Sequence, residues 1–240
     1  MDQLLIALDI PSGAQALQMA DTLRGVAGGF KIGSRLFTSE GPVVVRTLAA
    51  KGDRVFLDLK YHDIPNTVAT AVAAATSLGA WMINVHASGG LRMMREAAEA
   101  ARQTAAADGR PRPLVIAVTV LTSMRADMLA EVGVGLPVMD QVTRLASLAQ
   151  QAGLDGVVAS PHETRVLRQR CGEEFVIVTP GIRGGSAAAG RDDQERTMTA
   201  GEAMAEGASY IVVGRPIVGA PDPRDAAERI AQEIRAATSP

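Results

Sequence analysis

The feature of this sequence that most constrains its fold is the repeated alternation of short apolar runs with longer segments that have helical spacing. The runs are almost continuously apolar, which is typical of parallel strands buried under helices. They occupy residues 4–8, 30–33, 55–59, 81–86, 114–120, 156–160, 175–179 and 210–214. We therefore expect one domain over residues 1–240, a (β/α)8 TIM barrel of the α/β class, with a doubly wound open sheet as the weaker alternative.

The segments between these runs are expected to be mostly helical. Residues 36–50 read as one helix in spite of Pro42, and residues 121–137 read as a long connection before a helix over 138–151. The length of 240 residues suits a single barrel, which typically takes about 250. No linker, low-complexity segment or further repeat divides the chain.

The composition and the pattern of the sequence argue against several classes of protein. A net charge of −2 and 3% aromatic residues do not predict a surface for binding nucleic acid polymers. Cys171 is the single cysteine, so no internal disulfide can form, which fits a reducing compartment. The first residues lack a basic start and a cleavage site, and no apolar run approaches the roughly 20 residues of a membrane helix. We expect a cytoplasmic protein with no membrane partner.

Polar side chains gather at the carboxyl ends of the expected strands, where barrels of this class hold their active sites. They are Asp9, Lys31, Asp58, Lys60, His86, Thr119, Thr122, Ser123, Thr179, Arg183 and Arg215. One of them could be incidental, but this many at equivalent positions predict an active site. For His86, a core histidine with one hydrogen bond is an equally good interpretation.

The third run ends in a charged pair. Side chains alternate faces along a strand, so Phe56, Asp58 and Lys60 should point the same way. Buried charge is costly, so a strand rarely carries it without a role, although a structural ion pair is the alternative. Asp63 follows, and Pro65 then marks a helix start.

The last two strand ends have the composition of a phosphate site. Gly181 and Gly214 would let backbone N–H groups approach an anion, and Arg183 and Arg215 could add charge-assisted hydrogen bonds. Ordinary turns with solvated arginines are the alternative. Residues 184–193 are small and are expected to form a lid over bound substrate, or otherwise a variable surface loop.

The string Asp-x-Lys-x-x-Asp followed by Ile-Pro-Asn-Thr, at residues 58–67, resembles the active-site signature of the orotidine 5'-monophosphate decarboxylase family, short bacterial type. Asp-x-Lys alone also occurs in related sugar-phosphate barrels, so residues 62–67 and the final Gly-Arg-Pro-Ile are the specific parts. Further matching segments are residues 7–9, 30–33, 85–86, 121–123, 179–183 and 213–217.

This resemblance implies decarboxylation of orotidine 5'-monophosphate to uridine 5'-monophosphate and CO2, the last step of pyrimidine nucleotide synthesis. The implied catalytic array is Lys31, Asp58, Lys60 and Asp63, with Lys60 as the proton donor. By the same resemblance, Asp9 and Lys31 hold the ribose, Thr122 and Ser123 contact the pyrimidine edge, and Arg183, Gln194, Gly214 and Arg215 bind phosphate. The other implied substrate-binding residues are Ile64, Pro65, Asn66, Thr67 and Pro180.

The family resemblance also implies a homodimer in which Asp63 and Thr67 reach the neighbouring subunit's site. No cofactor is expected, because the array has its own cation and acid, and the histidines do not have the spacing of metal ligands. Two rival functions stay open. One is a magnesium-dependent keto-sugar-phosphate decarboxylase or synthase that uses Asp9 and Asp58 as ligands, and the other is a barrel that binds nucleotides without catalysis.

Overall fold

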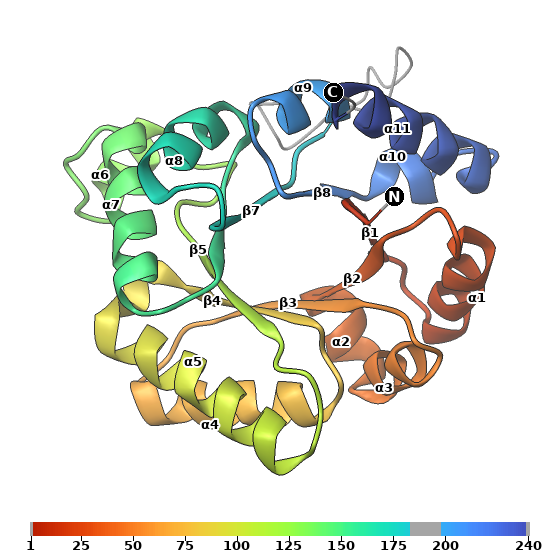
Figure 1. Cartoon of the computed structure of the whole chain (residues 1–240), viewed down its shortest axis with the longest axis horizontal. Helices are drawn as coiled ribbons and strands as arrows, with labels where there is room; N and C mark the ends of the chain where they lie inside the picture. The colour runs from red at the N-terminus through yellow and green to blue at the C-terminus, as the bar shows by residue number, and fades with distance from the viewer. Residues whose placement is uncertain (1, 183–197, 239–240) are drawn as a thin grey trace.

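The computed structural model describes residues 2–182 and 198–238, and within them parallel strands close into a barrel in sequence order (Figure 1). Strand β1 pairs with both β2 and β8, so that Leu5 lies opposite Gly29 on one side and Val212 on the other. This closure confirms the barrel and excludes the open sheet. The strands are β1 (Leu4–Ala7), β2 (Gly29–Gly33), β3 (Val55–Tyr61), β4 (Met82–His86), β5 (Leu114–Val118), β6 (Gly156–Val158), β7 (Val176–Thr179) and β8 (Tyr210–Val213).

The helices form a ring outside the barrel (Figure 1). They are α1 (Gly13–Leu23), α2 (Ser34–Glu40), α3 (Val43–Ala50), α4 (Pro65–Ser77), α5 (Gly90–Ala107), α6 (Ala126–Glu131), α7 (Val138–Gln151), α8 (Thr164–Cys171), α9 (Ala200–Ala205), α10 (Arg215–Val218) and α11 (Pro223–Thr238). Two short 3-10 turns, η1 (Ala87–Gly89) and η2 (Pro161–Glu163), follow β4 and β6. Among the described residues, no helix combines the length and the apolar character that crossing a bilayer requires.

Two of the expected connections differ from the structure. The single helix expected over residues 36–50 is wrong, because α2 ends at Glu40 and α3 begins at Val43. Gly41 has φ +67°, which ends α2, and Pro42 cannot donate the next intrahelical hydrogen bond. The long connection after β5 contains a further short helix, α6. The proposed lid at residues 184–193 lies outside the described part of the chain.

The apolar core has two layers that follow the alternation of side chains along each strand. Leu4 and Ile6 of β1 belong to the layer between the strands and the helices, whereas Leu5 and Ala7 point into the barrel. The inner layer is completed by Phe56, Met82, Ile116, Val178 and Val212. The barrel is therefore filled at its centre, and open space is available only toward its ends.

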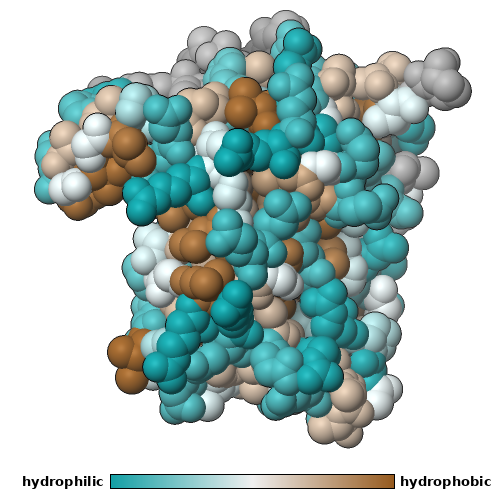
Figure 2. Space-filling model, turned by 60° about the vertical axis from the view of Figure 1, so that its left-hand side comes forward, coloured by the Kyte–Doolittle hydropathy of each residue, from teal (hydrophilic) through white to brown (hydrophobic). Residues whose placement is uncertain are grey.

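The outward-facing sides of the helices are largely polar. Figure 2, which brings the left-hand side of Figure 1 forward, shows hydrophilic residues over most of this face, with smaller hydrophobic areas between them. Helix α5 illustrates the cause, because Met93, Met94, Ala97 and Ala101 are buried while Arg92 on the same helix is exposed.

Strand β3 loses its regular register with β4 near the carboxyl end. Leu57 lies opposite Ile83 but Tyr61 lies opposite Val85, so β3 advances four residues where β4 advances two. Within this irregularity Lys60 has φ +53°, and it is the one non-glycine residue of the described chain with positive φ. Bulges of this kind redirect side chains beside functional sites, and this bulge lies at the end of the barrel described next.

Candidate active site

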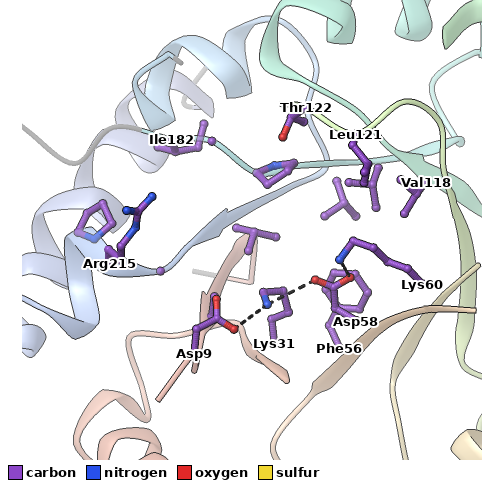
Figure 3. A pocket seen from close by; sticks show the side chains of 18 of the residues that line it. Asp9, Lys31, Phe56, Asp58, Lys60, Val118, Leu121, Thr122, Ile182 and Arg215 are labelled. Carbon is purple, nitrogen blue, oxygen red and sulfur yellow. Dashed lines mark hydrogen bonds and ion pairs between the residues drawn. The ribbon is translucent and has the colours of Figure 1, made fainter. Parts of the chain in front are cut away.

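A pocket of about 540 Å³ lies at the carboxyl ends of the strands (Figure 3). Its apolar lining comes from inward-facing strand residues that include Ala7, Phe56, Val158, Val178 and Val212. The structure brings one group of the polar strand-end residues together at this pocket. Those that line the pocket are Asp9, Lys31, Asp58, Lys60, Thr122 and Arg215, and the expected substrate-binding residues Pro180 and Gly214 line it as well.

Four charged side chains form an alternating chain along one wall of the pocket (Figure 3). Lys31 Nζ lies 3.2 Å from Asp9 Oδ1 and 3.4 Å from Asp58 Oδ2. Asp58 Oδ1 in turn accepts a hydrogen bond of 2.6 Å from Lys60 Nζ. The order is thus anion, cation, anion, cation, with each central residue held by opposite charges on both sides. Phe56, Asp58 and Lys60 all line the pocket, so the prediction that they share one face is confirmed.

Asp58 is the buried centre of this chain, with a side chain 12% exposed, whereas the side chain of Lys60 is 36% exposed. Burial by itself would raise the pKa of the Asp58 carboxyl. The ammonium groups of Lys31 and Lys60, together with hydrogen bonds from Lys60 and Asn84, outweigh it and bring that pKa below its usual value. Asp58 is therefore a fixed negative charge at neutral pH.

Asn84 is a residue that the sequence reasoning missed. It is fully buried in β4, its Nδ2 donates to Asp58 Oδ1 at 2.7 Å, and its Oδ1 accepts from the backbone N–H of Lys60 at 2.8 Å. A signal was present in the sequence, because an amide two positions after the inward-facing Met82 must also face into the barrel.

His86, at the end of β4, lies beside His62, with ring centroids 5.5 Å apart and ring planes tilted by 35°. Burial lowers the pKa of His86, electrostatic interactions with His62 and Lys60 lower it further, and the carboxylate of Asp58 opposes these effects. His86 is half-buried and does not line the pocket.

The opposite end of the pocket is formed by the loops after β7 and β8. Gly181 has φ +86°, a conformation that glycine adopts without strain, and Gly214 is followed by Arg215 at the start of α10. Figure 3 shows Arg215 across the pocket from Lys60. The pocket thus has a basic end at the two loops where barrels of this class often hold phosphate, and a charged chain at the other end.

Comparisons with known proteins identify the family. Residues 2–230 match the family described as "Orotidine 5'-phosphate decarboxylase / HUMPS family". The chain belongs to this family. It is similar to the orotidine 5'-phosphate decarboxylase of Moorella thermoacetica, at 55% identity over 97% of this chain and 92% of that protein. It is also similar to that of Syntrophotalea carbinolica, at 53% identity over 98% and 96% of the two chains.

A solved structure agrees with this assignment. The crystal structure of orotidine 5'-phosphate decarboxylase from Lactobacillus acidophilus is similar to this barrel, with a TM-score of 0.86 and 38% identity. The similarity covers 97% of this chain and 98% of that one. Family membership therefore extends over the whole barrel and does not depend on the signature at residues 58–67 alone.

Several residues singled out from the family signature lie away from the pocket within this chain. Asp63 is exposed, and its carboxylate accepts a hydrogen bond of 2.6 Å from the backbone N–H of its neighbour Ile64. Ile64 is 67% exposed, and Asn66, Thr67 and Ser123 are also exposed. None of these residues, nor the half-buried Pro65, lines the pocket. Arg183 and Gln194 lie outside the described residues.

The carboxylates of the pocket, Asp9 and Asp58, bind the ammonium groups of the protein's own lysine side chains. Asp58 uses one oxygen for Lys60 and Asn84 and the other for Lys31. In the described part of the chain, no group of three or more His, Cys, Asp or Glu side chains has an arrangement that could hold a metal ion. The site as built offers fixed charges and a proton-bearing amine.

Proposed function

We propose that this chain decarboxylates orotidine 5'-monophosphate to uridine 5'-monophosphate and CO2, the last step of pyrimidine nucleotide synthesis. The observation that carries the proposal is the ammonium of Lys60, held 2.6 Å from Asp58 at one end of a pocket whose other end carries Arg215. Membership of the family, with relatives at about half identity that carry this name, supports the same reaction.

The reaction needs a cation beside the carbon that loses CO2. When the bond between C6 and the carboxylate breaks, its electron pair stays on C6, where no ring carbonyl is placed to take it up. The Lys60 ammonium stabilises this charge and then transfers its proton to C6, which leaves a neutral amine that solvent must reprotonate. Fixed charges do this well because they need no reorganisation during the reaction.

The other pocket residues orient the substrate in this proposal. Phosphate binds at Gly214 and Arg215, with Arg183 and Gln194 from the segment after β7. Asp9 and Lys31 hold the ribose, and Thr122 and Ser123 contact the edge of the pyrimidine, with Pro180 beside them in the binding site. Phosphate binding far from C6 supplies energy that closes the site around the reacting carbon.

A second subunit completes the site in this proposal. Asp63 and Thr67 are exposed and do not line their own pocket, which suits residues that act on a neighbour. We infer a homodimer in which these two residues, with Ile64, Pro65 and Asn66 beside them, reach the partner's pocket. Asp63 would then be the fourth member of the array formed with Lys31, Asp58 and Lys60.

The proposed reaction uses no cofactor or metal ion, and this separates it from a magnesium-dependent keto-sugar-phosphate decarboxylase or synthase. Both oxygens of Asp58 accept contacts from protein donors, which leaves that carboxylate poorly disposed to bind magnesium. The test is a spectrophotometric assay with orotidine 5'-monophosphate in excess chelator. Full turnover supports the proposal, whereas activity that requires magnesium and a keto-sugar phosphate would replace it.

A further inference from the structure

We propose that Asn84 is a positioning residue for the decarboxylation, and that its single amide fixes both the carboxylate of Asp58 and the backbone of Lys60. This inference deepens the proposed function and rests on it. Asn84 itself does not line the pocket. It therefore acts through Asp58 and Lys60, which do line the pocket. Asn84 lies outside the family signature at residues 58–67.

The two contacts of Asn84 define its orientation. Its side chain lies 2.7 Å from a carboxylate oxygen of Asp58 and 2.8 Å from the backbone nitrogen of Lys60. A carboxylate accepts and a backbone N–H donates, so the Asn84 nitrogen must face Asp58 and the oxygen must face Lys60. With no exposed surface, the side chain has no alternative partner in solvent.

The contact with Lys60 holds an uncommon backbone conformation. Lys60 has φ +53°, which costs energy for any residue that carries a Cβ. The register shift between Leu57 and Tyr61 interrupts the ladder between β3 and β4 at this point. The side-chain oxygen of Asn84 then accepts the Lys60 N–H in the place where a strand carbonyl would otherwise do so.

The contact with Asp58 fixes where its charge lies. Oδ1 of Asp58 accepts from both Asn84 and Lys60 Nζ, while Oδ2 faces Lys31. Asn84 therefore joins the carboxylate of Asp58 to the main chain that carries the Lys60 ammonium. This closed arrangement sets the distance between the anion and the proton donor independently of the substrate.

The test compares Asn84→Ala and Asn84→Asp with the wild type, and uses Thr76→Val as the control. Thr76 is also buried, and its hydroxyl bonds to Val72 O inside α4, away from the pocket. We expect kcat of Asn84→Ala to fall by about 100-fold, the size of loss that a small misplacement of reacting groups produces. Its affinity for uridine 5'-monophosphate should change little, and Thr76→Val should keep the wild-type kcat.

Asn84→Asp separates the two hydrogen bonds without changing the shape of the side chain. The introduced carboxyl can still accept from the Lys60 N–H, but when ionised it repels Asp58. The titratable groups around this network are Asp58 and Lys60 on β3, Lys31 on β2 and His86 on β4. Protonation restores a donor toward Asp58, so the kcat of this variant relative to the wild type should rise as pH falls.

The outcomes keep this inference separate from the proposed function. If the wild type does not turn over orotidine 5'-monophosphate, the function is wrong, whatever the variants do. If the wild type does so but folded Asn84→Ala keeps kcat within about 3-fold of it, positioning by Asn84 is overturned. A pH-independent activity ratio for Asn84→Asp would also overturn it. A crystal structure of either variant with Lys60 shifted from positive φ would support it without reference to activity.

Discussion

The ammonium of Lys60 lies 2.6 Å from the carboxylate of Asp58, although both residues belong to one strand and a single residue separates them. The pair lies at the irregular end of β3, where Lys60 takes positive φ and its side chain lines the pocket. The pair is thus an anion fixed in the barrel wall and a cation held by that anion beside the cavity.

Lys60→Ala should abolish turnover and keep binding. The substitution removes the proposed proton donor but leaves the phosphate end of the pocket intact, so affinity for uridine 5'-monophosphate should stay measurable by calorimetry while decarboxylation becomes undetectable. This result would also reject a barrel that binds nucleotides without catalysis. Turnover near the wild-type level in folded Lys60→Ala would remove Lys60 from its proposed role.

Mixing two inactive variants should restore part of the activity. Lys60→Ala supplies a wild-type Asp63, and Asp63→Ala supplies a wild-type Lys60, so one site of a hybrid dimer receives both residues. We expect activity in the mixture that neither variant shows alone, measured after hybrid formation has been verified by native mass spectrometry. Hybrids that form without recovered activity would argue against a shared site.

Gly33→Ala should displace Lys31 without unfolding the barrel. A Cβ at this position would lie 2.9 Å from Lys31 Nζ and 3.0 Å from Asp9 Oδ1, while the backbone of Gly33, at φ −93° and ψ 178°, accepts alanine. The end of the Lys31 side chain must therefore move, and we expect kcat/KM to fall roughly 10- to 100-fold with little change in Tm.

The control for Gly33→Ala is Gly201→Ala. A Cβ at Gly201 in α9 meets its nearest neighbour, Glu233 O, at 3.4 Å, which is an ordinary contact away from the pocket. This variant should keep wild-type kinetics. An unchanged kcat/KM in Gly33→Ala would show that Lys31 can retain its place beside the added methyl group.

His86 should make the free energy of unfolding depend on pH. Its pKa in the folded chain is lowered, mainly by burial, below the value of about 6.5 for an unfolded chain. Between these two values the unfolded state binds more protons, so stability is full above about pH 6.5 and falls as pH drops toward the folded pKa. Denaturant titrations of His86→Gln should lack this component of the pH dependence.

His162→Gln is the matched control for that measurement, because His162 is exposed at η2. It should keep the pH dependence of the wild type. Identical pH profiles for His86→Gln and the wild type would show that His86 does not contribute to it.

The sequence predicted which residues form the site better than it predicted how they are arranged. Asp9, Lys31, Asp58, Lys60, Thr122 and Arg215 are predicted because they lie at or just beyond the ends of apolar runs, and in a closed barrel all strand ends meet at one rim. Asn84 was missed because it lies inside a strand and has no charge. The break between α2 and α3 was missed because Pro42 was compatible with a helix start, whereas Gly41 ended the preceding helix.

By itself, the sequence determined which side chains face the barrel centre and which strand ends carry charge, because the alternation of a strand is local and needs no knowledge of neighbours. The tertiary structure decided the conformation of Lys60 and the fixed position of Asp58. Both depend on an amide from β4, 24 and 26 residues further along the chain, whose hydrogen bonds exist only after β3 and β4 have paired with a shifted register. Contacts between distant segments have no local signature, so the precise placement of the two charges followed only from the folded barrel.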